Sequence, residues 1–222
     1  MEEKDLKESE LYLKAYGEKT GWLWMVICGV IAVLALLYSF ARLYVYRNFG
    51  AVIVDGDSMN MTLFDDEVLL LRRTQDGAVA DYGDVIVVYV GGYQEWQDGG
   101  TTNYIIKRLI AKEGDRVRSR NGKISVWKDW KNGGDWEELS EPYAHCLIPA
   151  DYDDFEYVVE DGEIFFLGDN RLNSEDSRYA QGYSKIDRLY KESDIYGVVP
   201  QWAIDYRAGI EFFFLQNVRE ND

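Results

Sequence analysis

Residues 23–41 form an unbroken run without a charged side chain, and this run constrains the fold more than any other feature. As an α-helix it would extend roughly 28 Å, close to the hydrocarbon thickness of a bilayer. Aromatic residues suited to the two membrane interfaces lie at both ends of the run: Trp22, Trp24, Tyr44 and Tyr46. We therefore predict a transmembrane anchor helix over residues 22–46.

A cleaved secretory signal is the alternative interpretation of this run. Such a signal has a shorter apolar core and ends at small residues, whereas this segment continues through Phe40, Leu43 and Tyr44. The pattern favours a retained anchor. Lysines dominate the flank before the helix, so the positive-inside tendency predicts a cytoplasmic segment over residues 1–21 and an extracytoplasmic domain over 47–222.

The part of the chain after the anchor has the composition of a folded domain. Hydrophobic residues make up 47% of the 222 residues, which is enough for a sizeable core. A formal net charge of -16 argues against nucleic acid as a partner, because phosphates require a basic face. Cys28 lies in the expected anchor and Cys146 far beyond it, so we predict two free thiols.

Short apolar runs separated by turn residues follow the anchor, and no long amphipathic pattern appears after residue 50. This predicts a mainly β fold with antiparallel strands. The expected strands include residues 51–54, 67–71, 85–90, 104–110, 123–127 and 163–167, with a hairpin loop near 91–100.

Three segments are less regular. Residues 116–161 are rich in tryptophan and predict an inserted β subdomain without a catalytic role. Residues 1–20 predict a short interfacial helix or a loose tail. Residues 210–215 fit a closing strand, a short helix or an apolar surface against the bilayer.

Ser58 lies in the segment 54–63 (VDGDSMNMTL), between turn-forming residues and an apolar run. A nucleophilic serine needs a base, and the single histidine, His145, has no triad context. Lys107 is the candidate base, because it lies within the apolar strand pattern at 104–110. Burial can lower a lysine pKa from ~10.4 to about 7 or 8, at a cost of roughly 4 kcal/mol.

Strand alternation places Ile105, Lys107 and Leu109 on one face, so Lys107 is expected to have apolar neighbours. The alternative is that Lys107 reaches solvent and pairs with an acid such as Asp169.

Residues 168–178 (GDNRLNSEDSR) follow the expected strand 163–167 and begin with turn formers. Their charged side chains predict a local ion network of Asp169, Arg171, Asp176 and Arg178. A salt-bridged surface loop is the alternative. No metal site is predicted, because histidine and cysteine ligands do not accompany these acids.

The segments 54–63, 104–115 and 168–178 resemble the signature boxes of bacterial type I signal peptidases. The resemblance runs from about residue 22 to about residue 200, and the third box is the most specific. Met61 and Glu113 stand where the family usually has proline, and Ile105 where it commonly has tyrosine. None of these departures removes a group that does chemistry.

The resemblance implies roles for individual residues. Ser58 would be the nucleophile and Lys107 its base, with Ser174 orienting Lys107. Asp169, Asp176 and Arg178 would brace the site. Gly56 would permit close backbone approach, while the Ser58 N–H would donate to the oxyanion. Some relatives place a serine at the position of Gly56 as a second donor, so that side-chain donor is missing here.

The resemblance also implies partners. Secretory preproteins would bind at the lipid bilayer, with the cleavage segment added as a strand. Small side chains would enter shallow pockets lined by Val54, Met59, Leu63 and Ile106. No cofactor is implied.

Two other functions remain alternatives. A self-cleaving Ser-Lys protease would share the dyad and the β fold, but the anchor and the absence of a basic DNA-binding segment argue against it. A non-catalytic, membrane-tethered β domain would require the three boxes to be accidental or decayed.

Overall fold

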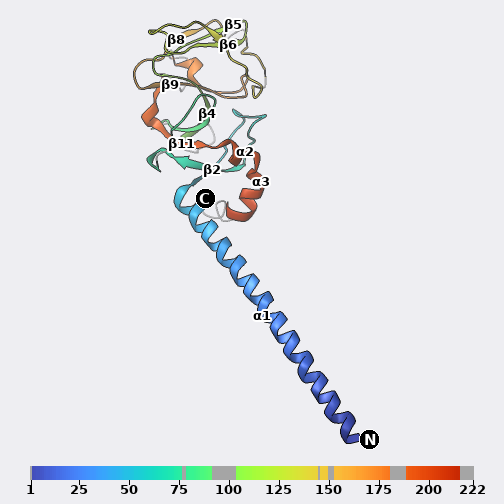
Figure 1. The fold of residues 1–222 in the computed structure, drawn as a ribbon. Coiled ribbons are helices and arrows are strands. Elements are labelled where there is room, and N and C mark those ends of the chain that lie inside the picture. The colour runs from blue at the N-terminus through green and yellow to red at the C-terminus, as the bar shows by residue number, and fades with distance from the viewer. Residues whose placement is uncertain are drawn as a thin grey trace. The chain divides into compact units, whose positions relative to one another are not determined.

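The structure is a computed structural model that describes residues 2–76, 79–91, 104–144, 146–149, 153–180 and 189–215. It consists of two units, Met1–Arg47 and Asn48–Asp222 (Figure 1). The hairpin loop expected near 91–100 falls mostly outside the described residues. Cys28 and Cys146 are free thiols, as predicted.

Helix α1 (Glu2–Asn48) forms the first unit. Its segment Thr20–Asn48 is long and apolar enough to cross a membrane, and it contains the predicted 22–46 span. The expected loose or separate N-terminal segment is instead continuous with this helix. Oppositely charged residues four apart, such as Glu10 and Lys14, favour helix in that polar stretch.

The second unit is built on antiparallel strands, which confirms the predicted mainly β fold. Seven strands form one sheet in the order β1-β2-β11-β3-β4-β9-β10. Their bounds are β1 Gly50–Ile53, β2 Val68–Arg73, β3 Val85–Tyr89, β4 Tyr104–Lys112, β9 Glu163–Leu167, β10 Tyr190–Lys191 and β11 Ile195–Val199. All of the predicted strands outside 116–161 have a counterpart here.

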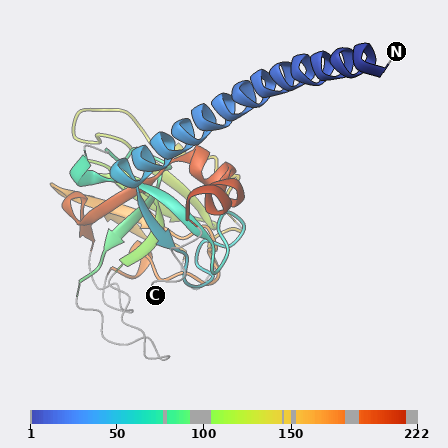
Figure 2. The same cartoon turned by 90° about the horizontal axis from the view of Figure 1, so that it is seen from below.

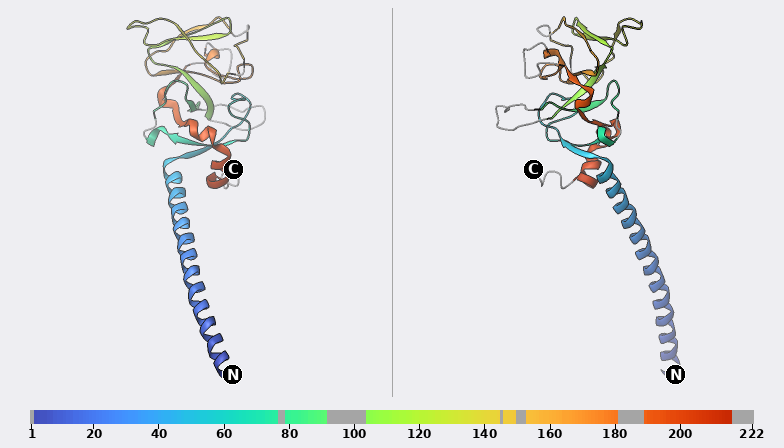
Figure 3. Two further views of the ribbon diagram at one scale, coloured as in Figure 1. Left: turned by 45° about the vertical axis from the view of Figure 1, so that its right-hand side comes forward. Right: turned by 90° about the vertical axis from the view of Figure 1, so that its left-hand side faces the viewer.

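A second, four-stranded antiparallel sheet has the order β7-β6-β5-β8. It lies at the top of this unit in Figure 1 and in both views of Figure 3. Its strands are β5 Arg116–Arg120, β6 Lys123–Trp127, β7 Glu137–Glu138 and β8 Glu156–Val158. The sheet coincides with the expected 116–161 region. Its core is nevertheless shared with the main sheet, so its status as an inserted subdomain stays a prediction.

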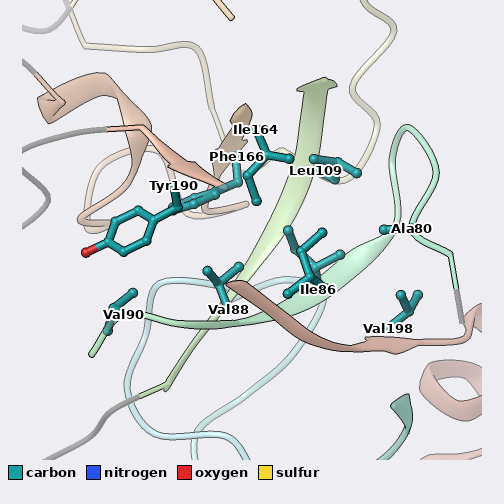
Figure 4. Close-up of a cluster of buried hydrophobic side chains, with 10 residues drawn as sticks. Ala80, Ile86, Val88, Val90, Leu109, Ile164, Phe166, Tyr190 and Val198 are labelled. Carbon is teal, nitrogen blue, oxygen red and sulfur yellow. The ribbon is translucent and has the colours of Figure 1, made fainter. Parts of the chain in front are cut away.

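Two buried clusters hold the second unit together, and β4 contributes to both. In one cluster, the side chains of Ile86 and Val88 point toward the same space as Leu109 and Phe166 (Figure 4). The other cluster joins Val117, Ile124 and Val126 of the second sheet to Ile110 and Ala111 of β4 and to Phe165 and Leu167 of β9. A register irregularity between Leu109 and Ala111 lets one strand serve both clusters.

Strand β11 lies in the middle of the main sheet, between β2 and β3, and the sequence analysis did not assign it. Gly197 interrupts its apolar run, and a glycine inside a strand weakens the sequence signal. The glycine is needed here, since a Cβ would lie 2.5 Å from Leu71 Cδ1 and 2.8 Å from the Arg72 carbonyl oxygen.

Short helical segments complete the unit. They are η1 Thr74–Asp76, η3 Ser177–Tyr179, η4 Glu192–Asp194, α2 Gln201–Asp205, α3 Arg207–Ile210 and the π-helical turn η5 Glu211–Leu215. A view from below shows α2 and α3 grouped on one side (Figure 2). Residues 210–215 are therefore helical, which excludes the closing strand, and their contact with the bilayer stays a prediction.

Candidate active site

Ser58 lies in a tight turn after β1, and buried apolar side chains fix this turn in the domain. Gly56 has φ +88°, a left-handed conformation that glycine adopts without strain. The N–H groups of Thr62 and Leu63 donate to the Met59 carbonyl oxygen at 3.1 and 2.9 Å. Met59 and Leu63 are fully buried, so they anchor the turn that carries Ser58.

The backbone conformation at Met61 explains why this position departs from the proline of the family pattern. Its φ is +87°, whereas a proline is fixed near -65°. Proline therefore does not fit this backbone. Met61 is also exposed, so its side chain adds no core packing in return for the strained conformation.

Lys107 approaches Ser58 from the buried middle of the sheet. It lies on β4 directly opposite Ile86, and only 4% of it is exposed. Its Nζ lies 2.7 Å from Ser58 Oγ and donates a second hydrogen bond to the Ile106 carbonyl oxygen at 3.0 Å. The two proposed catalytic groups are thus within proton-transfer distance.

Burial lowers the pKa of Lys107 to about 8, although the negative charges of Asp176, Glu175 and Asp169 act in the opposite direction. A substantial neutral fraction therefore exists at mildly alkaline pH. The alternative in which Lys107 pairs with Asp169 is wrong. Asp169 instead accepts two hydrogen bonds from Arg108, at 2.8 and 2.6 Å.

The turn at residues 168–170 packs directly on the Ser58 backbone. The Asn170 N–H donates to the Ser58 carbonyl oxygen at 3.0 Å, and its side-chain amide donates to the Asp57 carbonyl oxygen at 3.0 Å. Thr62 Oγ1 donates to Asp169 at 2.6 Å. Asn170 and Thr62 were missed as positioning residues, although Asn170 stands inside the third motif.

Asp176 and Arg178 form a buried ion pair beside this turn, as the sequence predicts. Arg178 Nε and Nη2 donate to the two carboxylate oxygens at 2.7 and 3.0 Å. Burial alone would raise the pKa of Asp176. The charge and hydrogen bonds of Arg178, with the Gly168 N–H and the nearby Ser174 hydroxyl, outweigh burial and lower that pKa.

The predicted local network of four charges is wrong in its other half. Asp169 pairs with Arg108 on β4, and Arg171 pairs with Glu141, which follows β7. Sequence proximity suggested pairing within the loop. The structure instead uses these charges to connect the loop to two other elements.

Ser174 is buried near the dyad, but it makes no hydrogen bond to Lys107. Its Oγ has no hydrogen bond of normal geometry with the described residues. Its proposed role in orienting Lys107 therefore stays a prediction.

The close backbone approach expected at Gly56 stays a prediction. A Cβ at this position would meet no heavy atom within 4 Å, so its positive φ, rather than close packing, calls for glycine. Its N–H donates to Asp65 Oδ1 at 2.8 Å. The Ser58 N–H, by contrast, has no acceptor among the described residues and remains available to a substrate carbonyl.

The four expected pocket residues differ in exposure. Val54, Met59 and Leu63 are at most 3% exposed, whereas Ile106 is half-buried. The first three hold the Ser58 turn in place. Whether they also line substrate pockets stays a prediction.

Gly168 provides a direct test of the packing around Ser58. A Cβ there would lie 2.5 Å from the Ser58 carbonyl oxygen and 2.1 Å from Ser174 Oγ. Gly168→Ala should therefore displace the turn, destabilise the domain by about 1 to 3 kcal/mol and lower the rate of Ser58 acylation. Unfolding and labelling by a serine-directed probe measure both effects. Gly209→Ala is the control, because a Cβ there meets nothing within 4 Å.

Within the described ranges, no group of three or more histidine, cysteine, aspartate or glutamate side chains is placed to hold a metal ion. A serine hydroxyl within hydrogen-bond distance of a buried lysine amine is an arrangement that can support acyl transfer.

Comparisons with known proteins identify the family. The family model described as signal peptidase, peptidase S26, matches residues 22–204. A signal peptidase I from Bacillus caldolyticus is 30% identical over 202 residues, covering 85% of this chain and 97% of that protein. Signal peptidase I U of Bacillus subtilis is 29% identical over 173 residues, covering 74% of this chain and 82% of that protein.

A crystal structure of a signal peptidase I from Enterococcus faecalis V583 is also similar. It shares 25% sequence identity at a TM-score of 0.39, covering 55% of this chain and 98% of that one. The family match extends over most of the chain and includes the segments that carry Ser58, Lys107 and residues 168–178. This chain belongs to the signal peptidase family, peptidase S26.

Proposed function

We propose that this protein is a membrane-anchored serine endopeptidase that removes signal peptides from secretory preproteins, with Ser58 as nucleophile and Lys107 as general base. The observation that carries the proposal is the 2.7 Å separation of Lys107 Nζ and Ser58 Oγ in a chain of this family. The low exposure and lowered pKa of Lys107 support it.

The first half of the reaction forms an acyl-enzyme. Neutral Lys107 accepts the proton of Ser58 Oγ as that oxygen attacks the scissile carbonyl. The Ser58 N–H donates to the resulting oxyanion. Protonated Lys107 then gives the proton to the leaving amine, and the mature protein departs with a new N-terminus.

The second half releases the signal peptide. Lys107, neutral again, takes a proton from a water molecule that attacks the ester carbonyl. The proton returns to Ser58 Oγ as the ester bond breaks. A single lysine therefore serves as base and acid in both steps.

For the substrate contacts, we propose the arrangement expected from the sequence. The cleavage segment would add as a strand next to the site, with small side chains in pockets near Val54, Met59, Leu63 and Ile106. Three of these residues are buried core residues, which favours shallow pockets with little room for larger groups.

Cleavage of a defined preprotein tests the function. The full-length protein in detergent is incubated with a secretory preprotein, and the N-terminus of the product is sequenced. We expect cleavage at the signal-peptide junction by the wild type and none by Ser58→Ala. Cleavage of the chain itself alone would favour the self-cleaving alternative. The absence of both cleavage and Ser58 labelling would favour a binding domain.

The rate should depend on pH through Lys107. Only the neutral amine is a base, so activity should rise with pH along a limb whose midpoint lies near 8, the pKa of Lys107. Initial rates on one substrate across pH 6 to 10 measure this limb. A rate that falls over the same range would contradict a lysine base.

The proposal places the catalytic unit outside the cytoplasm at the membrane surface. Phe49, which directly follows α1, contacts the Trp202 ring at 5.5 Å between centroids. Several aromatic side chains of residues 202–213 are exposed: Trp202, Tyr206, Phe212 and Phe213. Exposed aromatic residues suit a membrane interface.

Protease protection tests this sidedness. In intact cells stripped of their wall, added protease should digest the region after Arg47 and leave the first twenty residues protected. Detergent-permeabilised cells serve as the control, in which both regions become accessible. Protection of the catalytic unit in intact cells would contradict the proposed orientation.

A further inference from the structure

Two buried arginines hold the turn that packs on Ser58. Arg108 donates two hydrogen bonds to the Asp169 carboxylate, and its Nη1 donates to the Gly83 carbonyl oxygen at 2.7 Å. Arg171, only 2% exposed, donates from Nε to the Gly168 carbonyl oxygen at 3.0 Å. The turn 168–171 is thus held from both sides by guanidinium groups.

Residues 141–143, which follow β7 of the second sheet, contact both arginines. Glu141 accepts from Arg171 Nη1 and Nη2 at 3.1 and 2.6 Å, a bidentate pair. The Tyr143 ring centroid lies 4.0 Å from Arg108 Cζ, a cation–π contact. The Tyr143 hydroxyl donates to Glu141 at 3.3 Å, which links the two contacts.

The segment itself is attached to the second sheet. The Leu139 N–H donates to the Ile124 carbonyl oxygen on β6 at 2.9 Å, just before Glu141. The Ala144 N–H donates to the Glu141 carbonyl oxygen at 3.0 Å, which closes a turn around Tyr143. Its proline, Pro142, restricts the backbone between the two contacting residues.

Burial sets the importance of these contacts. Side-chain exposure is 1% for Arg171 and 11% for Glu141, so little water can replace either partner. A buried guanidinium without its carboxylate is strongly unfavourable, and the turn would have to shift to solvate it. Such a shift reaches Ser58 directly, since the Asn170 N–H donates to the Ser58 carbonyl oxygen.

We propose that Glu141 and Tyr143 are positioning residues of the active site, and that the second sheet acts on catalysis through them. Their side chains contact Arg171, Arg108 and each other. They fix Arg171 and Arg108, which fix the 168–171 turn and hence the distance between Ser58 Oγ and Lys107 Nζ. The inference rests on the function proposed above.

The test compares Glu141→Gln with Glu138→Gln. Both change one carboxylate to an amide near the edge of the second sheet, but Glu138 is exposed and pairs with exposed Lys123. We expect Glu141→Gln to lower kcat about ten- to a hundredfold, as small displacements of catalytic groups do, while KM changes little. Glu138→Gln should leave both constants unchanged.

A second pair of variants avoids a buried unpaired charge. Tyr143→Phe keeps the ring over Arg108, whereas Tyr143→Leu removes it. Only Tyr143→Leu should lower kcat. If Glu141→Gln does not fold, Tyr143→Leu alone tests whether this segment positions the active site. Folded Glu141→Gln and Tyr143→Leu proteins with unchanged kcat and a reduced melting temperature would overturn the inference, because they would show a purely structural contact.

The inference and the proposed function fail in different ways. Cleavage by the wild type and its loss in Ser58→Ala establish the function independently of Glu141. If the wild type does not cleave a preprotein, the rate of Ser58 acylation by a serine-directed probe still reports positioning. A slower acylation in Glu141→Gln would then support the inference without the function.

Discussion

Lys107→Arg should abolish cleavage in a folded protein. Arginine keeps the positive charge, but its guanidinium does not deprotonate at any working pH, so it cannot accept the Ser58 proton. General-base catalysis contributes roughly 10²- to 10⁴-fold, and the arginine variant should lose at least that factor. Because Lys107 is only 4% exposed, the larger side chain must also displace its neighbours.

Two measurements separate lost chemistry from lost structure. Circular dichroism and unfolding report whether Lys107→Arg is folded, and Lys107→Met, which is closer in size to lysine, removes the base without adding bulk. Both variants should be inactive on a preprotein over the whole range of pH 6 to 10. Substantial turnover by either folded variant would falsify the Ser-Lys dyad.

Asp176→Asn should cause the largest loss of stability among single polar substitutions near the site. It removes the Asp176 carboxylate from the ion pair with Arg178, whose side chain is 1% exposed. Breaking a buried pair by removing one partner costs about 3 to 5 kcal/mol. Denaturant unfolding measures this loss. Glu138→Gln, in an exposed pair, should change the free energy of unfolding very little.

The same substitution should shift the pH dependence of catalysis. Burial lowers the pKa of Lys107, and among the charges that raise it Asp176 has the largest effect. Removing that charge favours the neutral amine, so the pKa should fall below about 8 and the activity limb should move to lower pH. A folded Asp176→Asn variant with an unshifted limb would show that Asp176 does not act electrostatically on Lys107.

Much of the fold, and the burial of Lys107 beside Ser58, could be predicted because their causes are local. An uncharged run of spanning length predicts α1, and short apolar runs between turns predict β2, β3 and β9. Lys107 was predicted to be buried with a lowered pKa because a lysine inside an apolar strand loses solvation wherever the strand is placed. These patterns depend on neighbouring residues in the chain.

The partners of the charged residues could not be predicted, because they depend on tertiary packing. Arg171 and Asp169 lie close together in sequence, yet each pairs with a residue far away, Glu141 and Arg108. Likewise, nothing near Ser58 indicates that Asn170 binds its carbonyl oxygen. Strand β11 was missed because Gly197 interrupts its apolar pattern. The glycine is required by the close packing of β2 against this position, which only the folded sheet shows.

The left-handed backbone at Met61 has a consequence for engineering this enzyme. Stabilising designs often replace an unusual residue by the one most frequent among relatives, and that rule would introduce proline here. A proline ring does not allow φ +87°, so proline at this position would require the turn next to Ser58 to be rebuilt. The residue most frequent among relatives is therefore the wrong choice here. Glycine, which family statistics would not suggest, is the replacement that relieves the strain. At this position the backbone conformation, rather than the family average, should guide design.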